Sequence, residues 1–440
     1  MSTFRPGDPT EIKSMAQLEA FFEPHARKRG RVGVELELLP LDARARIVPY
    51  SGPRGVEAAL KAACDRCKPV LEGGHVIALL LAKGGMVSLE PGGQVEVDSP
   101  PVLKIADLSA FFESTLRHLS KTAKALDFGL FPWGIAPYGS PGDRPDVPKV
   151  RYRILKERLL RSGSMGRWMM KLTAASHYCL DYESEEDLKL KIAAALRLLP
   201  YVLAFTANAP IASGRRQRWR TKRPWIWRHT DPLRCGLPAF FFSERMGFAA
   251  YVRYALSRPL LFLVRDGRYV PGDGRSFGEW LERPNRLGPL TVGDWDLHLS
   301  TLFPDLRLRA GYLEIRTLDA LPLPLFLAVA ALFKGLLGEP NALQCVLEEL
   351  PAPAQRLERQ GLLDAARLGP AWVPDSAPSA MAMMPRVLAL AARGLRVLGD
   401  EASWLSPLQA LVDRGACPAH SWKKDGEGTW RGPGLFSEIG

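Results

Sequence analysis

Two separate stretches of the sequence, residues 31–38 (RVGVELEL) and 88–97 (SLEPGGQVEV), place carboxylate or amide side chains two positions apart, Glu35 with Glu37 and Gln94 with Glu96. The oxygen-bearing side chains of these stretches are Glu35, Glu37, Glu90, Gln94 and Glu96. A β-strand with this alternation turns its apolar side chains to one face and its carboxylates to the other. At a rise of about 3.3 Å per residue, Glu35 and Glu37 lie about 7 Å apart, close enough to repel each other or to share a cation.

A third stretch, residues 312–316 (YLEIR), places Glu314 and Arg316 on one polar strand face together with Tyr312. Two interpretations fit such faces. One is an exposed face of an antiparallel sheet, where alternating glutamates are common. The other is a site for a hard cation such as Mg²⁺, which prefers carboxylate and water oxygens and usually works with phosphates.

Two further features carry chemically versatile side chains. His177 shares a strand face with Cys179, and a single histidine among small residues can be a core residue or a metal ligand. Residues 213–228 hold seven Lys and Arg residues interleaved with three tryptophans. This run suits a nucleic-acid surface, a site for phosphates and carboxylates that arginines bind through two hydrogen bonds, or a solvated loop.

Composition indicates an ordinary globular protein of 440 residues, 47% of them hydrophobic. The net charge of +12 favours anionic partners of some kind. Six cysteines are too few for a disulfide scaffold, and the pair Cys64 and Cys67 is expected on a helix over residues 55–68. The first 31 residues contain no apolar signal segment, so we expect a cytoplasmic protein. The apolar run 321–332 contains two prolines and predicts a buried helix rather than a membrane span.

Periodicity predicts an alternation of strands and helices. Strands are expected at residues 31–38, 76–81, 86–97, 175–181 and 312–316, and helices at residues 12–22, 55–68, 106–126, 187–205, 328–350, 354–368 and 384–398. The familiar glycine-rich phosphate loop, the serine nucleophile elbow and the His-Glu-x-x-His zinc motif are absent from the sequence. Any use of ATP must therefore rely on another architecture.

Several ordered motifs resemble the glutamate-cysteine ligases, in the branch that includes the plant-type enzymes and the bacterial ligases of ergothioneine pathways. The motifs are GVELE (33–37), LEPGGQVE (89–96), KVRY (149–152), MM (169–170), LDY (180–182), ANAP (207–210), Arg223 with IW (226–227), HLSTLFP (298–304) and YLEIR (312–316). Together they extend over most of the chain.

The resemblance implies an α+β fold with a curved, mostly antiparallel β-sheet funnel surrounded by helices, similar to the catalytic domain of glutamine synthetase. It implies an N-terminal helical lead-in (1–30), an ATP-dependent ligase catalytic domain (31–337) and a C-terminal helical region packed on the same domain (338–440). The expected substrates are glutamate, ATP and cysteine or another amine. We expect a monomer or homodimer with no membrane partner and no nucleic acid, although a nucleic-acid binder acting through residues 213–228 is the alternative from another class.

The resemblance also implies a reaction. ATP phosphorylates the side-chain carboxylate of glutamate with the help of Mg²⁺, and the amine of cysteine attacks the acyl phosphate to give γ-glutamylcysteine. By similarity the metal ligands are Glu35, Glu37, Glu90, Glu96, Glu314 and His177. The expected catalytic residues are Arg316 and Arg151, and the expected substrate-binding residues are Arg223, Trp227, Gln94, Thr173, Cys179 and Tyr312.

Some positions depart from the plant-type pattern. His177-Tyr178-Cys179 replaces Gln-Val-Asn and resembles the enterobacterial branch, whose histidine binds metal, and Thr317-Leu318 replaces Gly-Ala. Because these residues border the expected pocket, the acceptor could be an amine other than cysteine. Replacing either Glu96 or Glu314 by Gln is expected to abolish turnover and leave the fold intact, because each change removes one charge from a crowded acidic face.

Overall fold

The computed structural model describes residues 7–23, 30–143, 146–282, 287–352, 355–375 and 377–437. Within them a nine-stranded sheet has the order β14-β15-β7-β1-β5-β4-β3-β2, with β6 paired to β1. Its strands are β1 (Val32–Leu41), β2 (Cys67–Glu72), β3 (His75–Leu81), β4 (Met86–Leu89), β5 (Val95–Asp98), β6 (Gly129–Phe131), β7 (Ala175–Asp181), β14 (Leu306–Arg309) and β15 (Tyr312–Asp319). Every named pair in this sheet is antiparallel.

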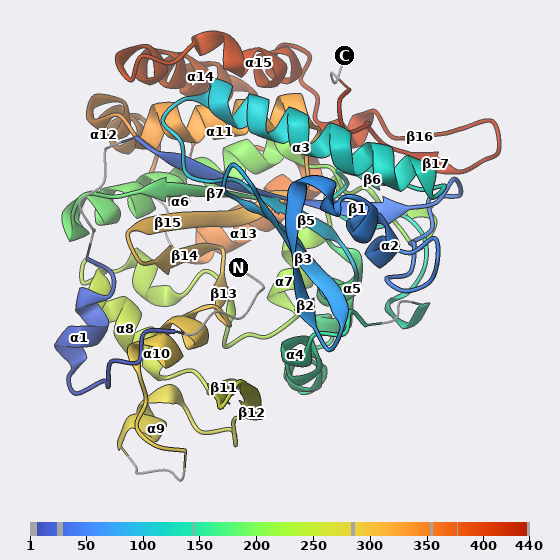
Figure 1. Cartoon of the computed structure of the whole chain (residues 1–440). Coiled ribbons are helices and arrows are strands. Elements are labelled where there is room, and N and C mark those ends of the chain that lie inside the picture. Colours follow the sequence, from blue (N-terminus) through green and yellow to red (C-terminus); the bar gives the residue numbers. More distant parts are fainter. Residues whose placement is uncertain are drawn as a thin grey trace.

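One face of this sheet is apolar because β1 alternates as the sequence predicts, and it is covered by helices (Figure 1). Against it lie α3 (Ile105–Ala125), α6 (Glu185–Thr206) and α11 (Leu323–Leu337). Phe112 of α3 meets Phe326 of α11 at 5.0 Å between ring centroids, and Phe326 lies 5.5 Å from Tyr178 of β7. Replacing the fully buried Phe112 by Ala is expected to cost about 3–5 kcal/mol.

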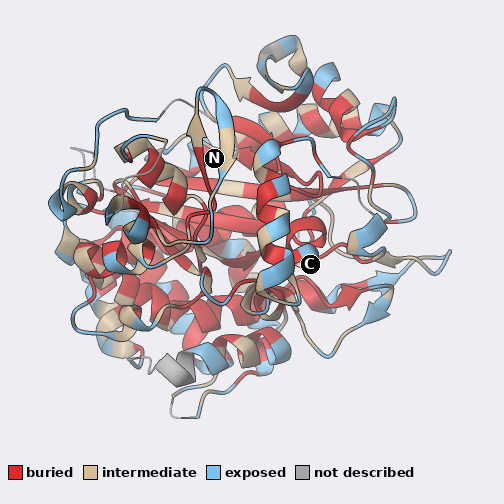
Figure 2. Ribbon diagram, turned by 90° about the horizontal axis from the view of Figure 1, so that it is seen from below, coloured by how far each residue is buried: buried red, intermediate tan, exposed pale blue. Residues whose placement is uncertain are grey.

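The outer helices beyond α11 complete this layer, as Figure 1 shows. They are α12 (Pro340–Glu349), α14 (Ala380–Val397) and α15 (Ser406–Asp413), whereas α13 (Gln355–Leu368) packs on α6 and contacts α7. Figure 2 shows the buried residues concentrated in the sheet and the helices packed on it, with exposed residues at the rim. No single described helix is long and apolar enough to cross a membrane; α11 and α12 pass that test only as a pair bent by 90°.

The opposite, polar face of the sheet is enclosed by a second group of shorter helices (Figure 1). These are α4 (Val150–Ser162), α5 (Gly166–Leu172), α7 (Arg223–Arg228), α8 (Phe248–Leu256), α9 (Phe277–Glu282) and α10 (Val292–Leu299); α1 (Met15–Ala20) and α2 (Val56–Ala62) lie near the edges. Small two-stranded sheets join β8 (Ile211–Ala212) to β9 (Arg215–Arg216), β10 (Cys235–Gly236) to β13 (Phe303–Pro304), β11 (Phe262–Arg265) to β12 (Arg268–Pro271) and β16 (Lys423–Lys424) to β17 (Trp430–Arg431). Short 3₁₀ helices are η1 (Cys64–Arg66), η2 (Pro141–Asp143), η3 (Ala239–Phe242), η4 (Gly369–Ala371), η5 (Ala402–Leu405) and η6 (Pro418–His420).

The α+β class and the mostly antiparallel sheet are confirmed, but two predicted helices are wrong in extent. The helix predicted over 55–68 stops at Ala62, and Cys67 begins β2 instead of sharing a helix with Cys64. The helix predicted over 328–350 is two helices. Glu339 accepts from the backbone N–H of Ala342 at 2.7 Å and so caps a new helix that begins at Pro340. Parts of the predicted lead-in, residues 1–6 and 24–29, and Ala354 lie outside the described residues.

Candidate active site

Strand register brings acids from distant parts of the chain onto the polar face of the sheet. Glu37 of β1 lies opposite Glu96 of β5, and Glu35 of β1 lies opposite His177 of β7 on one side and Asp98 on the other. Residues directly opposite in an antiparallel pair share a face, with Cβ atoms about 4.5–5.5 Å apart. The alternation seen in each separate strand therefore becomes one continuous acidic surface around β1.

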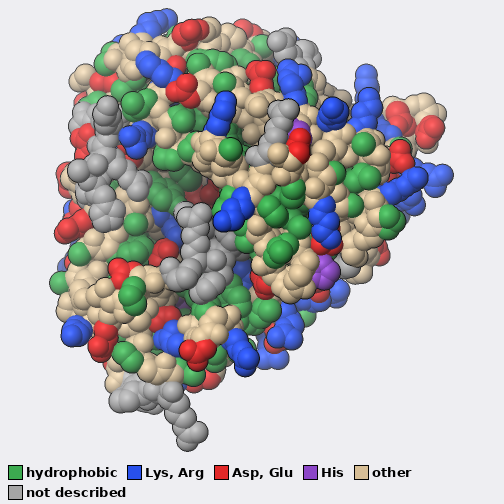
Figure 3. All heavy atoms as spheres, in the orientation of Figure 1, with side chains coloured by type: hydrophobic (Ala, Val, Ile, Leu, Met, Phe, Trp, Pro, Cys, Tyr) green, Lys and Arg blue, Asp and Glu red, His purple; other side chains and the backbone are tan. Residues whose placement is uncertain are grey.

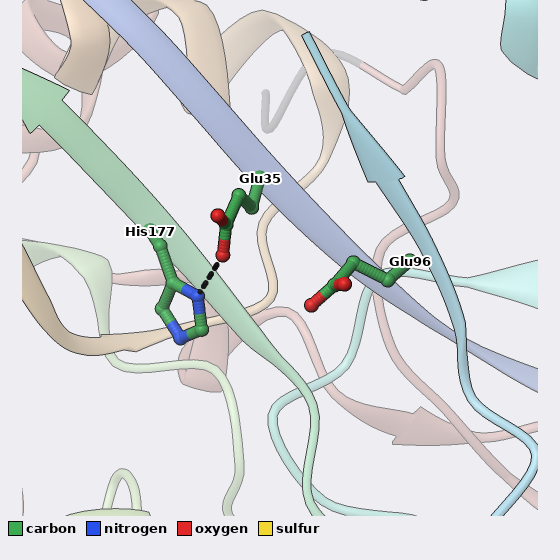
Figure 4. Close-up of side chains that lie close together, drawn as sticks. All are labelled: Glu35, Glu96 and His177. Atoms are coloured by element: carbon green, nitrogen blue, oxygen red, sulfur yellow. Dashed lines mark hydrogen bonds and ion pairs between the residues drawn. The ribbon is translucent and has the colours of Figure 1, made fainter. Parts of the chain in front are cut away.

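Glu35, Glu96 and His177 form the centre of this surface (Figure 4). Each offers a ligand atom, and those atoms lie within 4.8 Å of one another. Nδ1 of His177 donates to a carboxylate oxygen of Glu35 at 2.9 Å, and Nε2 of the same ring is buried with no hydrogen-bond partner among the described residues. A histidine held by a carboxylate through one nitrogen commonly coordinates a metal through the other.

The acids are crowded enough to hold protons in the absence of a cation. Burial, together with the charges of Glu90 and Glu35, raises the pKa of Glu96 to about 7. Burial and the charges of Glu90 and Glu96 raise the pKa of Glu37 well above its usual value. Burial would also raise the pKa of Glu35, but the hydrogen bond from His177 helps to lower it to about 2. A bound divalent cation would replace the shared protons, so the donor set fits such an ion.

Glu314 is in the same region but is held by arginines. Both of its oxygens accept from Arg307, at 2.7 and 3.0 Å, and one also accepts from Arg316. Burial acts to raise the pKa of Glu314, but the charges of Arg307 and Arg316 outweigh it and keep the pKa well below the usual value. The assignment of Glu314 as a metal ligand stays a prediction, and in this structure the carboxylate serves as the counterion of two arginines.

A β-bulge sets the position of Arg316. Ile315 pairs with Tyr178 and Leu318 with Ser176, so the two residues Arg316 and Thr317 lie opposite the single residue His177. Such a bulge re-aims side chains and is common next to active sites. The bulge is fastened by Arg223, whose guanidinium donates to the carbonyl oxygens of Arg316 at 3.1 Å and Thr317 at 2.9 Å.

A pocket opens above the acidic surface and contains most of the predicted site residues. Those lining it are Glu35, Glu37, Glu90, Glu96, His177, Gln94, Thr173, Arg151, Trp227 and Arg316. Arg223 instead lines a smaller adjoining hollow with Trp227, Arg316 and Thr317. Cys179 and Tyr312 lie outside both pockets, on β7 and β15, and Cys179 is directly opposite Glu314.

Gln94 and Thr173 contribute to the frame of the pocket. The side chain of Gln94 accepts from the backbone N–H of Gly92 at 2.9 Å and donates to the backbone oxygen of Thr173 at 2.7 Å. The hydroxyl of Thr173 donates to the backbone oxygen of Met169 at 2.7 Å. These bonds tie the Pro-Gly-Gly turn, where Gly93 has a φ of +82°, to the end of α5.

Several pocket residues were not predicted from the sequence. Arg307, Tyr152 and Phe303 all line the pocket. The hydroxyl of Tyr152 donates to the backbone oxygen of Leu89 at 2.6 Å, beside Glu90. Arg307 could have been found, because residues 306–309 (LRLR) alternate like the acid-bearing strands and place two arginines on one face.

The basic run at residues 213–228 divides between two places. Arg223 and Trp227 belong to the pocket region, where the guanidinium of Arg223 lies 5.5 Å from the Trp227 ring centroid. Arg215 and Arg216 are exposed on β9, and the guanidinium of Arg216 lies 5.0 Å from the ring of Trp430 in the C-terminal hairpin. Figure 3 shows Lys and Arg side chains gathered around that hairpin.

Comparisons with known proteins place these features in a family context. The family model described as glutamate-cysteine ligase family 2 (GCS2) matches residues 31–434. The chain is 34% identical over 365 residues to the chloroplastic glutamate-cysteine ligase of Brassica juncea, covering 82% of this chain and 70% of the relative. It is 30% identical over 415 residues to the chloroplastic glutamate-cysteine ligase B of Oryza sativa subsp. japonica, covering 93% and 82%.

The fold is similar to that of a solved glutamate-cysteine ligase from Francisella tularensis, determined in complex with AMP. The TM-score is 0.53 at 12% sequence identity, and the match covers 88% of this chain and 82% of that one. A bifunctional glutathione synthetase from Pasteurella multocida gives a TM-score of 0.50 at 16% identity, over 91% of this chain and 48% of that chain.

Proposed function

We propose a reaction for this chain from the premise that it belongs to glutamate-cysteine ligase family 2 and is an ATP-dependent ligase of the glutamate-cysteine ligase type. The γ-carboxylate of glutamate attacks the γ-phosphorus of ATP, which gives γ-glutamyl phosphate and ADP. The amine of cysteine then attacks the acyl carbon, phosphate leaves, and the product is γ-glutamylcysteine. The relatives' names and the AMP complex of the Francisella enzyme support this assignment.

The observation that carries the proposal is the juxtaposition of acids and arginines on one sheet face. Glu35, Glu96 and His177 offer cation ligands within 4.8 Å of one another, and Arg316 lines the same pocket. Phosphoryl transfer from ATP needs cations and fixed positive groups around several negative oxygens, and little covalent help from the protein. The site supplies both kinds of group on rigid strands.

We assign the cation to the carboxylates of the central strands. Glu35, Glu37 and Glu96, with Glu90 at the turn and Nε2 of His177, would hold Mg²⁺. Bound there, the ion would neutralise phosphate oxygens and lower the barrier to in-line transfer. An oxygen-rich donor set suits Mg²⁺, and the single imidazole also admits Mn²⁺.

Arg316 and Arg223 are assigned to the anionic parts of the substrates. Arg316 faces the pocket from the bulge and would stabilise charge that develops on the transferred phosphoryl group, because guanidinium stays protonated and donates in a fixed planar geometry. Arg223 holds the bulge, and with Trp227 it borders the adjoining hollow, which suits the α-carboxylate of glutamate. Arg151 also lines the pocket and is assigned to the phosphates of ATP.

The acceptor amine would enter near Thr317, which lines the smaller hollow, while Cys179 and Tyr312 line neither pocket and lie on the neighbouring strands β7 and β15. Burial, with the nearby charges of Glu314 and Glu35, raises the pKa of the Cys179 thiol well above its usual value, so this cysteine stays a neutral side chain and not a nucleophile. Of these residues, Cys179 and Thr317 depart from the plant-type pattern, whereas Tyr312 belongs to the matching motif YLEIR.

An amine scan tests the proposal. Purified protein is incubated with glutamate, ATP and MgCl₂ and with each of a panel of amines, and the products are identified by mass spectrometry. The expected product is γ-glutamylcysteine, formed together with ADP and phosphate. A γ-glutamyl product with a different amine, and none with cysteine, would replace cysteine as the acceptor; the absence of any glutamate-dependent ADP release would refute ligation itself.

A further inference from the structure

A second cavity lies outside the ligation pocket and is bordered by arginines. It measures about 710 Å³, within the usual range for small-molecule sites. The cavity is lined by four arginines: Arg245 from the segment before α8, Arg253 from α8, Arg258 from just after α8, and Arg359 from α13. No Asp or Glu is among the lining residues.

The floor of this cavity is apolar. Leu237 and Ala250 are buried there, while Phe240 and Tyr254 present ring surface and Leu233 is 42% exposed. A large leucine so open to solvent beside other apolar side chains marks a surface suited to covering by a ligand. The lining thus combines an apolar base with a positively charged rim.

The four arginines differ in the hydrogen bonds that their side chains make within the protein. The guanidinium of Arg258 donates to the backbone oxygen of Leu233 at 3.0 Å, and that of Arg359 donates to the backbone oxygen of Leu237 at 3.1 Å, so both are fixed in place. Arg245 and Arg253 are exposed, and neither side chain has a hydrogen bond or ion pair within the described part of the chain. Like charges around one cavity repel, and an anion placed between them removes that cost.

The cavity is joined to the ligation pocket by one pair of strands. Cys235, the first residue of β10, and Leu237, directly after that strand, line the arginine cavity, and β10 pairs in parallel with β13. The N–H of Phe303 donates to the backbone oxygen of Arg234 at 2.9 Å, and the N–H of Asp305 donates to that of Gly236 at 2.9 Å. Phe303 lines the ligation pocket, where its ring lies 5.8 Å from that of Trp227.

We propose that this arginine cavity is an effector site for a small organic anion that carries a carboxylate or phosphate head on an apolar body. The head pairs with Arg245 and Arg253, because guanidinium binds both kinds of oxyanion through two hydrogen bonds. The body covers Leu233 and Phe240. Occupancy shifts β10, and through its backbone bonds to β13 it moves Phe303 and changes the affinity of the ligation pocket for its substrates.

Binding is tested by calorimetry on the full chain with two probes, 4-nitrophenyl phosphate for the phosphate head and benzene-1,3-dicarboxylate for the carboxylate head. The Arg245→Gln/Arg253→Gln variant is expected to bind the preferred probe at least about tenfold more weakly, since charge-assisted contacts are lost. Its fold and basal ligation rate should be unchanged, because neither side chain has a partner to lose. The control is Arg268→Gln/Arg396→Gln, which removes the same charge from exposed positions elsewhere.

Several outcomes would overturn the site. If the control variant binds the probe as weakly as Arg245→Gln/Arg253→Gln does, the probe is attracted by the overall positive charge of the protein and not by this cavity. Loss of binding in Arg316→Gln, with no change in Arg245→Gln/Arg253→Gln, would place the anion in the ligation pocket. Binding of an oligoglutamate peptide, but of neither small probe, would mean a macromolecular partner instead.

The effector role has a separate readout. The bound probe should change the KM for glutamate in the native protein and not in Arg245→Gln/Arg253→Gln. This part rests on the proposed ligase function, whereas the calorimetry does not, so failure of ligation and failure of the site are distinguishable. Binding that leaves both kcat and KM unchanged would refute the coupling through β10 and β13.

Discussion

Nδ1 of His177 donates to the carboxylate of Glu35 at 2.9 Å across the β7–β1 pair, and this bond leaves Nε2 of the ring buried without a partner among the described residues. The two residues are 142 positions apart in the chain. Burial, together with the charge of Arg316, lowers the pKa of His177 to about 4, so the ring is neutral at physiological pH. A neutral imidazole oriented by a carboxylate can offer its free nitrogen lone pair to a cation.

Replacing His177 by Asn or by Gln tests the roles of the two ring nitrogens one at a time. Asn can keep the bond to Glu35 but reaches no further, whereas Gln extends toward the position of Nε2. We expect the concentration of Mg²⁺ or Mn²⁺ that gives half-maximal activity to rise about 10–100-fold in His177→Asn, and less in His177→Gln. Cation titrations of initial rate measure this. Unchanged cation dependence in His177→Asn would remove this residue from the metal site.

Replacing Glu96 by Gln should remove activity and leave the protein at least as stable. Burial and the charges of Glu90 and Glu35 raise the pKa of Glu96 to about 7, so ionising this side chain in the cation-free protein is unfavourable. Loss of a metal ligand should lower kcat by at least about 100-fold. The melting temperature without cations should stay equal or rise. Glu348→Gln, at an exposed position on α12, is the matched control.

Glu314→Gln should behave differently from Glu96→Gln. The sequence alone placed the two acids in one class and predicted an intact fold for both changes. In the structure Glu314 is fully buried and accepts from Arg307 and Arg316, so the neutral amide leaves the buried guanidinium of Arg307 and the partly buried guanidinium of Arg316 without their shared carboxylate. We expect loss of about 3–5 kcal/mol of unfolding free energy together with activity. Denaturant titration measures it, and stability equal to that of Glu96→Gln would contradict the pairing.

The contrast between these two acids shows where prediction from sequence stops. Alternation alone assigned Glu35, Glu37, Glu96 and Glu314 to polar strand faces, because side-chain direction follows from a period of two. It could not give the partners, since they depend on which strands pair and in what register. His177 meets Glu35, and Arg307 meets Glu314, only because β7 lies between β1 and β15 and β14 folds back on β15.

The bulge was hidden for a related reason. Nothing in the local pattern of residues 312–319 reveals that two residues of β15 oppose one residue of β7. The helix break, in contrast, is signalled in the sequence, because Gly338 and Pro340 interrupt the apolar period over 328–350 and Glu339 between them caps the new helix. At the bulge a local backbone feature, held by hydrogen bonds from Arg223, overrides a regular alternation of side chains.

Asp319 should make stability depend on pH. Burial raises its pKa from 3.8 to about 6, although it accepts from the N–H of Asn208 and the hydroxyl of Thr221. Because the folded pKa exceeds the unfolded one, the contribution of this group to stability is complete at low pH and is lost as the pH rises through about 6. The total change is about 3 kcal/mol, of which about 1 kcal/mol falls between about pH 5 and pH 7.5.

Asp319→Asn isolates this contribution. The amide oxygen can still accept from Asn208, and the amide N–H₂ can donate to Thr221 after its hydroxyl rotates. The difference in unfolding free energy between native protein and variant should therefore move in favour of the variant as the pH rises over that interval. A difference that stays constant with pH would show that this carboxyl does not titrate there.

Arg223→Lys tests whether the β15 bulge must be held for catalysis. The guanidinium of Arg223 donates to two successive carbonyl oxygens of the bulge and lies 5.5 Å from the ring of Trp227. An ammonium group keeps the charge but cannot reproduce the planar donor geometry or the stacking. Arg316 should then lose its fixed position, and displacements of about 1 Å can cost about 100-fold in rate.

We therefore expect kcat for Arg223→Lys to fall by about 10–100-fold, since the phosphoryl-stabilising guanidinium of Arg316 is misplaced in the transition state. The KM for ATP should change little, because Arg223 does not line the main pocket. Steady-state kinetics separate these parameters, and a melting curve verifies the fold. Arg218→Lys, exposed in the same basic run, is the control. A rise in the KM for glutamate without loss of kcat would instead give Arg223 a role in substrate binding alone.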